Sequence, residues 1–268
     1  MPRLAAGLMV LGLVLVGAAL VDRFGPSAAA GSRADRDEIV DPPSPSTSAP
    51  ASPTTSPPST QPSTSPTSTV LSLNVAYPKS GPGTFVYATT TGPVLGTTGA
   101  IRKFHVAMES NITQVEMADF TTKIDQTLGD PRSWIAGGAY RLQQVPKSTD
   151  AQFTVYLVTE QTSVRMCAPL QTGGYTSCRQ GAHVVLNLDR WMASVTSYVN
   201  ADVPLDTYRT YMINHEVGHA LGNSHQLCPG NGKPAPVMEQ QTFGLHGCVP
   251  NPWPYIDGKL YKGPPGRY

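Results

Sequence analysis

The sequence is short of charge, and the charge it has is balanced. Only 14% of its 268 residues are charged, and 19 basic residues stand against 18 acidic ones, for a formal net charge of +1. Such a chain has no electrostatic means of attracting nucleic acid or an anionic surface. It also lacks a glycine-rich phosphate loop and any internal repeat. We therefore expect an ordinary globular domain that binds no nucleic acid.

Cysteine is scarce as well, and no two cysteines lie close enough in sequence to form a pair of zinc ligands. This disfavours a structural zinc site built from cysteines. The four cysteines form two local pairs, Cys167 with Cys178 and Cys228 with Cys248. In an exported chain the even count predicts two disulfides with these pairings, although three pairings are formally open.

Long apolar runs are absent except at the N-terminus, where residues 4–21 carry no charge. Eighteen apolar residues are typical of a short membrane anchor or a long signal peptide. The triplet Ala28-Ala29-Ala30 resembles a cleavage site, but it lies late after the apolar run, which favours an anchor. We expect residues 1–30 to be a signal peptide or a single-pass membrane anchor, with the rest of the chain exported and either membrane-attached or secreted.

Residues 31–70 have little that could enter a hydrophobic core. Proline, serine and threonine make up 25 of the 30 residues from Asp41 to Val70. Such a segment cannot offset its loss of conformational entropy on ordering, so we expect a disordered linker. Residues 71–268 remain, and a domain of that size can bury a sizeable core.

The most informative segment of this domain is the run His215–His225, which reads HEVGHALGNSH. On a helix, His215 and His219 lie one turn apart on the same face and can share one Zn²⁺. Glu216 is offset from His215 by roughly 100° around the axis, beside the metal but not bound to it. A carboxylate placed there can act as a general base toward a water molecule.

The next residues extend the pattern to a third ligand. Gly222 stands where a residue with positive φ would end the helix and turn the chain. His225 follows three residues later, so it can return to the metal. Three histidines leave the fourth tetrahedral position open, which is typical of a catalytic zinc site. Upstream, Pro204 and Asp206 mark the helix start, with Asp206 the expected N-cap.

The run His215–His225 resembles the extended zinc signature of metzincin metalloproteases. That resemblance implies a tight turn with a methionine beneath the metal, and residues 236–239 look like this Met-turn, with Met238 as its methionine. Two positions depart from the family pattern: Gln226 directly follows the third histidine, and Gln240 stands where some members carry a tyrosine. The role of that tyrosine is therefore either vacant or taken by a residue such as Tyr255.

Residues 75–260 as a whole look like an uncharacterised metzincin-like domain of secreted and membrane-bound actinobacterial proteins. The resemblance implies a zincin fold but no particular substrate. The expected fold is α+β and metzincin-like: a mixed twisted sheet, an active-site helix, and a loop-rich C-terminal part containing the Met-turn.

Local patterns predict the elements of this fold. The proline-rich segment after residue 228 excludes long regular elements. By analogy with other zincins, the strand 183–188 is the candidate to line the cleft, with an interior position as the alternative. The predicted strands are 85–87, 104–108, 140–145, 153–158 and 183–188, and the predicted helices are 113–128 and 191–199 together with the helix that carries the histidines.

The leading hypothesis for function is an extracytoplasmic zinc peptidase acting on a protein or peptide substrate. His215, His219 and His225 would hold Zn²⁺, and Glu216 would be the general base. One alternative is a non-catalytic surface module in which zinc shapes a binding face. The other is a hydrolase of a non-peptide amide in the cell envelope, which would use the same residues in a different pocket.

Overall fold

The computed structural model describes residues 72–268. The predicted signal peptide or anchor and the linker lie outside the described residues. Among residues 72–268, no helix combines the length and the apolar character needed to span a membrane.

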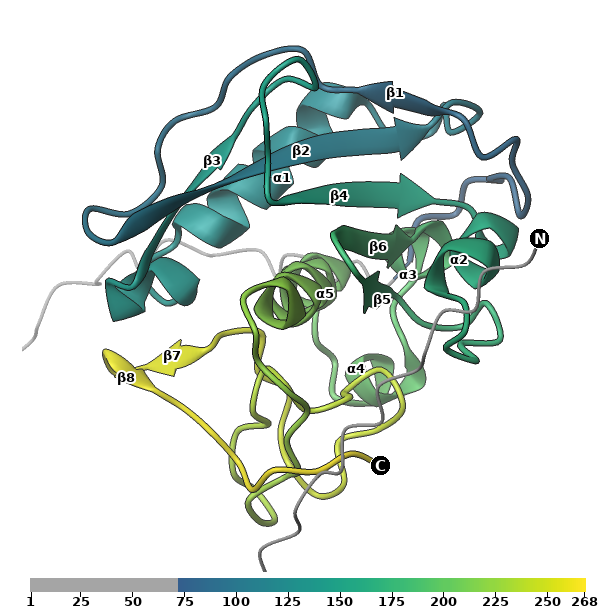
Figure 1. Ribbon diagram of the computed structural model, residues 1–268. Coiled ribbons are helices and arrows are strands. Elements are labelled where there is room, and N and C mark those ends of the chain that lie inside the picture. Colours follow the sequence, from purple (N-terminus) through teal and green to yellow (C-terminus); the bar gives the residue numbers. More distant parts are fainter. Residues whose placement is uncertain (1–71) are drawn as a thin grey trace, which may run out of the picture. The chain divides into compact units, whose positions relative to one another are not determined.

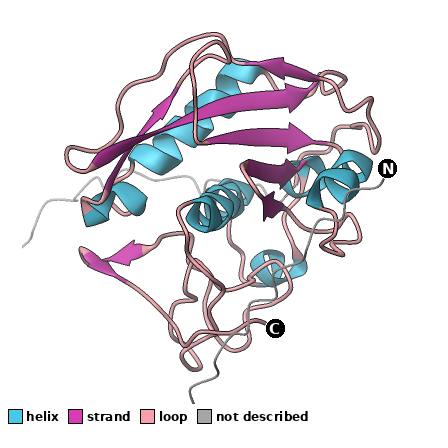
Figure 2. Cartoon of the chain, viewed as in Figure 1, coloured by secondary structure: helices cyan, strands magenta, loops and turns pink. Residues whose placement is uncertain are grey.

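Strands and helices follow one another up to residue 220, and after that the chain is almost entirely loop (Figure 2). The strands are β1 (Phe85–Tyr87), β2 (Ala100–Glu109), β3 (Tyr140–Gln144), β4 (Phe153–Val158), β5 (Cys178–Gln180), β6 (His183–Asn187), β7 (Tyr255–Ile256) and β8 (Lys259–Leu260). The helices are α1 (Met117–Gly129), the 3₁₀ helix η1 (Trp134–Gly137), α2 (Glu160–Cys167), α3 (Leu188–Met192), α4 (Thr196–Asn200) and α5 (Leu205–Ala220).

Six strands form one mixed, twisted sheet (Figure 1). Its order is β1-β2-β4-β6-β5, and β3 pairs with β2 beside this path. Strands β2, β3, β4 and β6 are parallel, whereas β1 and β5 run antiparallel to their neighbours. The predicted α+β class with a mixed sheet is therefore confirmed.

The core follows from alternation along the central strands. In β4, Phe153, Val155 and Leu157 enter the main core, while Tyr156 and Val158 belong to a second apolar cluster. Side chains that alternate in this way line opposite faces of a sheet. Helices α1 and α5 pack on each other and against the main-core face (Figure 1). Helix α5 thereby lies between the sheet and the C-terminal loops.

Several predicted elements differ in their boundaries, and strand β2 begins four residues earlier than predicted, at Ala100 rather than at residue 104. Helix α1 begins at Met117 rather than at residue 113, and Glu116 is its N-cap. The predicted helix 191–199 is two short helices, α3 and α4. Asp206 is not the N-cap of α5, because Pro204 holds that position. Instead, Oδ2 of Asp206 forms an ion pair with Nζ of Lys123 on α1 at 2.8 Å.

Of the two positions left open for strand 183–188, the cleft-lining one is wrong and the interior one is confirmed. β6 pairs with β4 on one side and with β5 on the other. The edge next to α5 belongs to β5, whose three residues show no apolar alternation that a sequence pattern could reveal. Cys178, the first residue of β5, forms the predicted disulfide with Cys167 at the end of α2.

Candidate metal centre

Helix α5 presents two of the three histidines. Its opposite face carries Ile213 and Val217, both fully buried in the main core, so the helix is fixed to the sheet side of the domain. His215 and His219 lie one turn apart with ring centroids 4.8 Å apart. The apolar stripe thus determines which way the imidazoles face.

The end of α5 turns the chain back toward these imidazoles. Gly222 has φ +92°, a left-handed conformation that favours glycine. The amide of Asn223 donates to the carbonyl of Gly218 at 2.9 Å, and the amide of Gly222 donates to that of His219 at 3.1 Å. This pair of hydrogen bonds is the Schellman motif, which ends a helix and redirects the chain.

His225 completes the cluster. Its Nε2 atom lies 3.1 Å from Nε2 of His219, and one nitrogen from each of the three histidines lies within 4.8 Å of the others. A tetrahedral zinc ion with bonds of about 2.0–2.1 Å holds its nitrogen ligands roughly 3.3 Å apart. The donor set and its spacing therefore fit Zn²⁺.

Backbone carbonyls fix the orientation of two imidazoles. Nδ1 of His215 is 2.8 Å from the carbonyl oxygen of Val237, and Nδ1 of His219 is 2.8 Å from that of Asn223. When Nδ1 donates to a carbonyl, the Nε2 lone pair is left for a metal. Burial, the largest cause, lowers the pKa of all three histidines, that of His225 to about 4.

Glu216 is the carboxylate of the cluster. The residue is 6% exposed, and its Oε2 atom has no hydrogen-bond partner among the described residues. Burial raises the pKa of this carboxyl to about 8, and the charge of Arg179 opposes the shift. A divalent cation held by the neighbouring histidines would act in the same direction as Arg179 and lower this pKa.

The turn Pro236–Glu239 lies against α5 beneath the histidines. The amide of Glu239 donates to the carbonyl of Pro236 at 2.9 Å, which closes the turn. Met238 is buried, and its sulfur packs on Gly218 of α5, as does the ring of Trp134. The methionine singled out in the sequence thus lies beneath the histidine helix.

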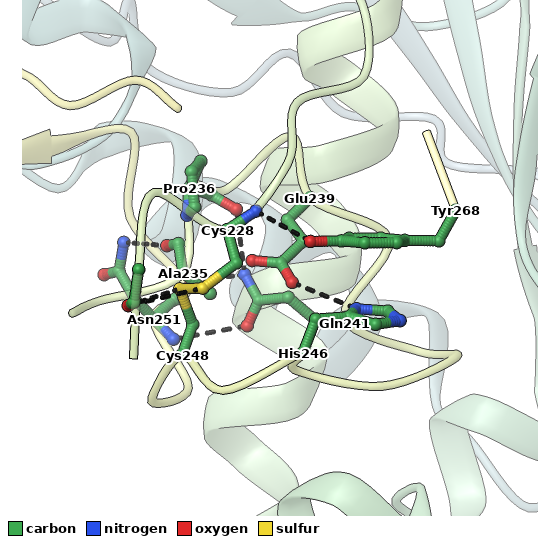
Figure 3. The surroundings of a disulfide bond; sticks show 10 residues. Cys228, Ala235, Pro236, Glu239, Gln241, His246, Cys248, Asn251 and Tyr268 are labelled. Carbon is green, nitrogen blue, oxygen red and sulfur yellow. Dashed lines mark hydrogen bonds and ion pairs between the residues drawn. A yellow bond between two sulfur atoms is a disulfide. The ribbon is translucent and has the colours of Figure 1, made fainter. Parts of the chain in front are cut away.

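The loops around this turn are tied together by the second predicted disulfide, Cys228–Cys248, and by buried amides (Figure 3). Nε2 of Gln241 donates to the carbonyls of Pro236 and Asn251, at 3.1 and 2.8 Å. Its own backbone amide donates to the hydroxyl of Tyr211 on α5 at 2.9 Å. A region without long strands or helices is thereby fixed under the histidines.

Glu239 and His246 lie at the edge of the same loops (Figure 3). The Glu239 side chain is fully buried, and Oε1 is 3.4 Å from Nδ1 of His246. Burial raises the pKa of Glu239 to about 7. The His246 ring stacks on Tyr268, and neither of these two residues lines the pocket at the histidines.

An open pocket of about 350 Å³ exposes the cluster to solvent. His215, Glu216, His219 and His225 all line it. Tyr255 does not; its hydroxyl packs against Gly137 instead. Gln240 does line the pocket, and its Oε1 atom is buried without a hydrogen-bond partner among the described residues.

Several pocket residues carried no signal in the sequence. They come from the loop before β5, from β5 itself and from the segments after α5, and no short motif connects them. They include two apolar residues, Leu170 and Phe243, and two arginines, Arg179 and Arg267. Gly218 was also missed as a contact residue, although a glycine inside a helix is a signal of close packing.

Together these observations define an α+β domain with an open pocket that contains three convergent histidines and a buried glutamate. A family model described as "Protein of unknown function (DUF3152)" matches residues 72–256, and the chain belongs to that family. No curated protein and no solved structure gave a significant match.

Proposed function

We propose that the protein is an extracytoplasmic zinc peptidase of the metzincin type. The observation that carries the proposal is the convergence of His215, His219 and His225 beside the unpartnered carboxylate oxygen of Glu216, in a pocket open to solvent. The turn with Met238 beneath the helix supports the metzincin assignment. The two disulfides support the compartment, because such bonds persist outside the reducing cytoplasm.

The three histidines would hold Zn²⁺ through Nε2, with His215 and His219 oriented by their Nδ1 contacts to backbone carbonyls. Zinc bound there would act as a Lewis acid on the substrate carbonyl and would acidify a water molecule. Purely structural zinc sites have four protein ligands, and this cluster offers three histidines, which favours catalysis over a structural role.

Glu216 would act as the general base. Its Oε2 atom would accept the proton of the attacking water and deliver it to the amine that leaves. The buried, weakly solvated environment favours a carboxyl that takes up and releases a proton near neutral pH. Gln240 lines the same pocket and would contact the substrate there.

The test combines metal analysis with proteolysis. Wild-type protein should contain about one zinc per chain and should cleave peptides from a mixed library, and a chelator should abolish the cleavage. Glu216→Gln should keep the zinc and lose nearly all turnover, whereas His219→Ala should lose the zinc. His183→Ala, a histidine of β6 outside the pocket, is the matched control and should behave as wild type.

Two results would redirect the proposal. Bound zinc without cleavage of any peptide would favour the non-catalytic surface module or the hydrolase of a non-peptide envelope amide. Full activity of Glu216→Gln would contradict the assigned base. Whether the protein is anchored by its N-terminus or secreted is decided separately, by the presence of residues 1–30 in the mature chain.

A further inference from the structure

The pocket at the histidines carries an unusual balance of charge for a protein with a net charge of +1. Among residues 72–268, two arginines line it, Arg179 and Arg267, and Glu216 is the only acidic residue that does so. Neither arginine forms an ion pair with a carboxylate of residues 72–268. A bound Zn²⁺ would add further positive charge, so the pocket favours an anionic ligand group.

Arg179 is held at the histidines by backbone contacts. It lies in the middle of β5, the edge strand, and one guanidinium nitrogen donates to the carbonyl of His219 at 3.1 Å. A second nitrogen is 3.4 Å from the carbonyl of Gly181. Guanidinium has five N–H donors and these two carbonyls are uncharged. The group therefore keeps both its charge and free donors toward the pocket.

Arg267 reaches the pocket from the C-terminal segment beside His225. The amide of Gly266 donates to the carbonyl of His225 at 3.2 Å, and Gln226 forms a β-bridge with Pro265. These contacts fix the segment that carries Arg267 along His225. The side chain itself is exposed, so a ligand can reach it without displacing other groups.

The remaining wall of the pocket includes exposed apolar side chains. Leu170 is 49% exposed and Phe243 is 57% exposed, and both line the pocket. The ring of Phe243 stacks on that of Tyr175, with centroids 6.1 Å apart. The guanidinium carbon of Arg190 lies 4.6 Å from the centroid of the Tyr175 ring. A ligand with both an apolar part and a negative group would match such a wall.

We propose that the substrates are peptides that carry a carboxylate close to the scissile bond, and that Arg179 and Arg267 bind this carboxylate. The inference rests on the proposed peptidase function. Arginine suits this task because its planar fork donates two parallel hydrogen bonds to a carboxylate. The carboxylate belongs either to an aspartate or glutamate side chain or to the free C-terminus of the peptide.

The first test measures binding without turnover. Zinc-loaded Glu216→Gln protein is titrated with fluorescent peptides in pairs, each glutamate peptide having a glutamine twin, and all with blocked C-termini. We expect the glutamate peptides to bind on the order of tenfold more tightly. The preference should shrink as salt is added. Equal binding of the twins, with no gain from an unblocked C-terminus, would overturn the proposal.

A third peptide separates the two sources of the carboxylate. It carries the glutamine twin's sequence with a free C-terminus. Tighter binding of this peptide than of the blocked glutamate peptide would assign the arginines to the substrate terminus. The reverse order would assign them to an acidic side chain. Either order supports a bound carboxylate, provided that the tighter of the two peptides also binds more tightly than the blocked glutamine twin.

Variants connect the preference to the two arginines. Arg179→Gln combined with Arg267→Gln should abolish the discrimination between twins, while Arg141→Gln, an arginine of β3 outside the pocket, should retain it. In Arg267→Glu the added negative charge should reverse the preference, so that a peptide with lysine in place of the glutamate binds more tightly than the glutamate peptide. Zinc content and melting temperature are measured for each variant. An unchanged preference in the double variant would overturn the assignment.

The same peptides separate this inference from the proposed function. If the wild-type protein cleaves peptides but treats the twins alike, the peptidase stands and the carboxylate preference fails. If the twins are discriminated in binding but no peptide is cleaved, the preference stands and the peptidase fails.

Discussion

The sulfur of Met238 lies directly on the backbone of Gly218. A Cβ placed on Gly218 would be 2.6 Å from that sulfur and 2.6 Å from Cζ2 of Trp134, closer than real Cβ atoms approach other atoms. Gly218 lies between His215 and His219 on α5, so this contact joins the turn Pro236–Glu239 to the turn of helix that bears two of the histidines.

Gly218→Ala should therefore destabilise the domain by about 1–3 kcal/mol, the usual cost of overpacking. The sign of the change in unfolding free energy distinguishes the two effects, because helix propensity alone would make alanine more stable than glycine by about 1 kcal/mol. Denaturant unfolding measures the effect, and zinc affinity should fall with it. A stabilised variant would show that the contact with Met238 is loose.

Gly222→Ala tests the reversal of the chain after α5. No atom lies within 4 Å of an added Cβ, so only the positive φ of +92° opposes the change. We expect a loss of about 1 kcal/mol and weaker zinc binding, since His225 follows the turn. Asparagine tolerates this conformation better, and Gly222→Asn is therefore the control. Identical zinc affinity in the wild type and both variants would mean that the conformation at Gly222 does not determine the position of His225.

Removal of the Cys228–Cys248 disulfide should weaken the region beneath the histidines. The bond closes a loop with a sequence separation of 20 residues, and the chain-entropy model gives about 3 kcal/mol for such a loop. Replacing both cysteines by serine should lower the melting temperature and the zinc affinity together. The matched control replaces Cys167 and Cys178. It should lower stability with a smaller effect on zinc, because neither cysteine belongs to the loops beneath the histidines, although Cys178 lines the pocket.

Glu239 should make stability depend on pH. Burial raises its folded-state pKa to about 7, above its ordinary value of 4.5, so the folded protein holds a proton that the unfolded chain releases in this range. The contribution of Glu239 to stability is therefore fully present below pH 4.5 and is lost as pH rises through 7.

Glu239→Gln isolates that contribution. The difference in unfolding free energy between the variant and wild type should shift in favour of the variant by on the order of 2 kcal/mol between pH 5 and 8. The other titrating groups contribute equally to the unfolding free energy of both proteins, so their contributions cancel in the difference. A constant difference across this range would mean that His246, 3.4 Å away, keeps Glu239 charged.

The elements with a strong period were predictable. The apolar stripe of α1 made that helix predictable, whereas α5 followed from the histidine spacing. Strand β4 has no period, since all six residues are buried, and matched its predicted bounds as an unbroken run of strand-forming residues. The edge position of β5 was not predictable, because three residues carry no periodic signal. The histidine cluster followed from spacing along one helix and one turn, which is local geometry.

The rest of the pocket depends on contacts between segments far apart in sequence. Arg179 faces His219 because β5 pairs with β6, and Trp134 reaches Gly218 because η1 packs near α5. Neither relationship leaves a pattern in the chain. A local pattern also failed at Asp206: its side chain suggested an N-cap, but Pro204 is the N-cap and the helix starts two residues earlier than expected.

The carbonyl of Val237 that orients His215 belongs to a residue 22 positions downstream. During synthesis and export from the N-terminus, α5 therefore emerges before the groups that prepare its first imidazole. A nascent chain that stops short of Val237 contains all three histidines but not the carbonyl that orients His215. If the histidines hold zinc as proposed, a product truncated before Val237 would lack the carbonyl that orients His215 and should bind the metal more weakly.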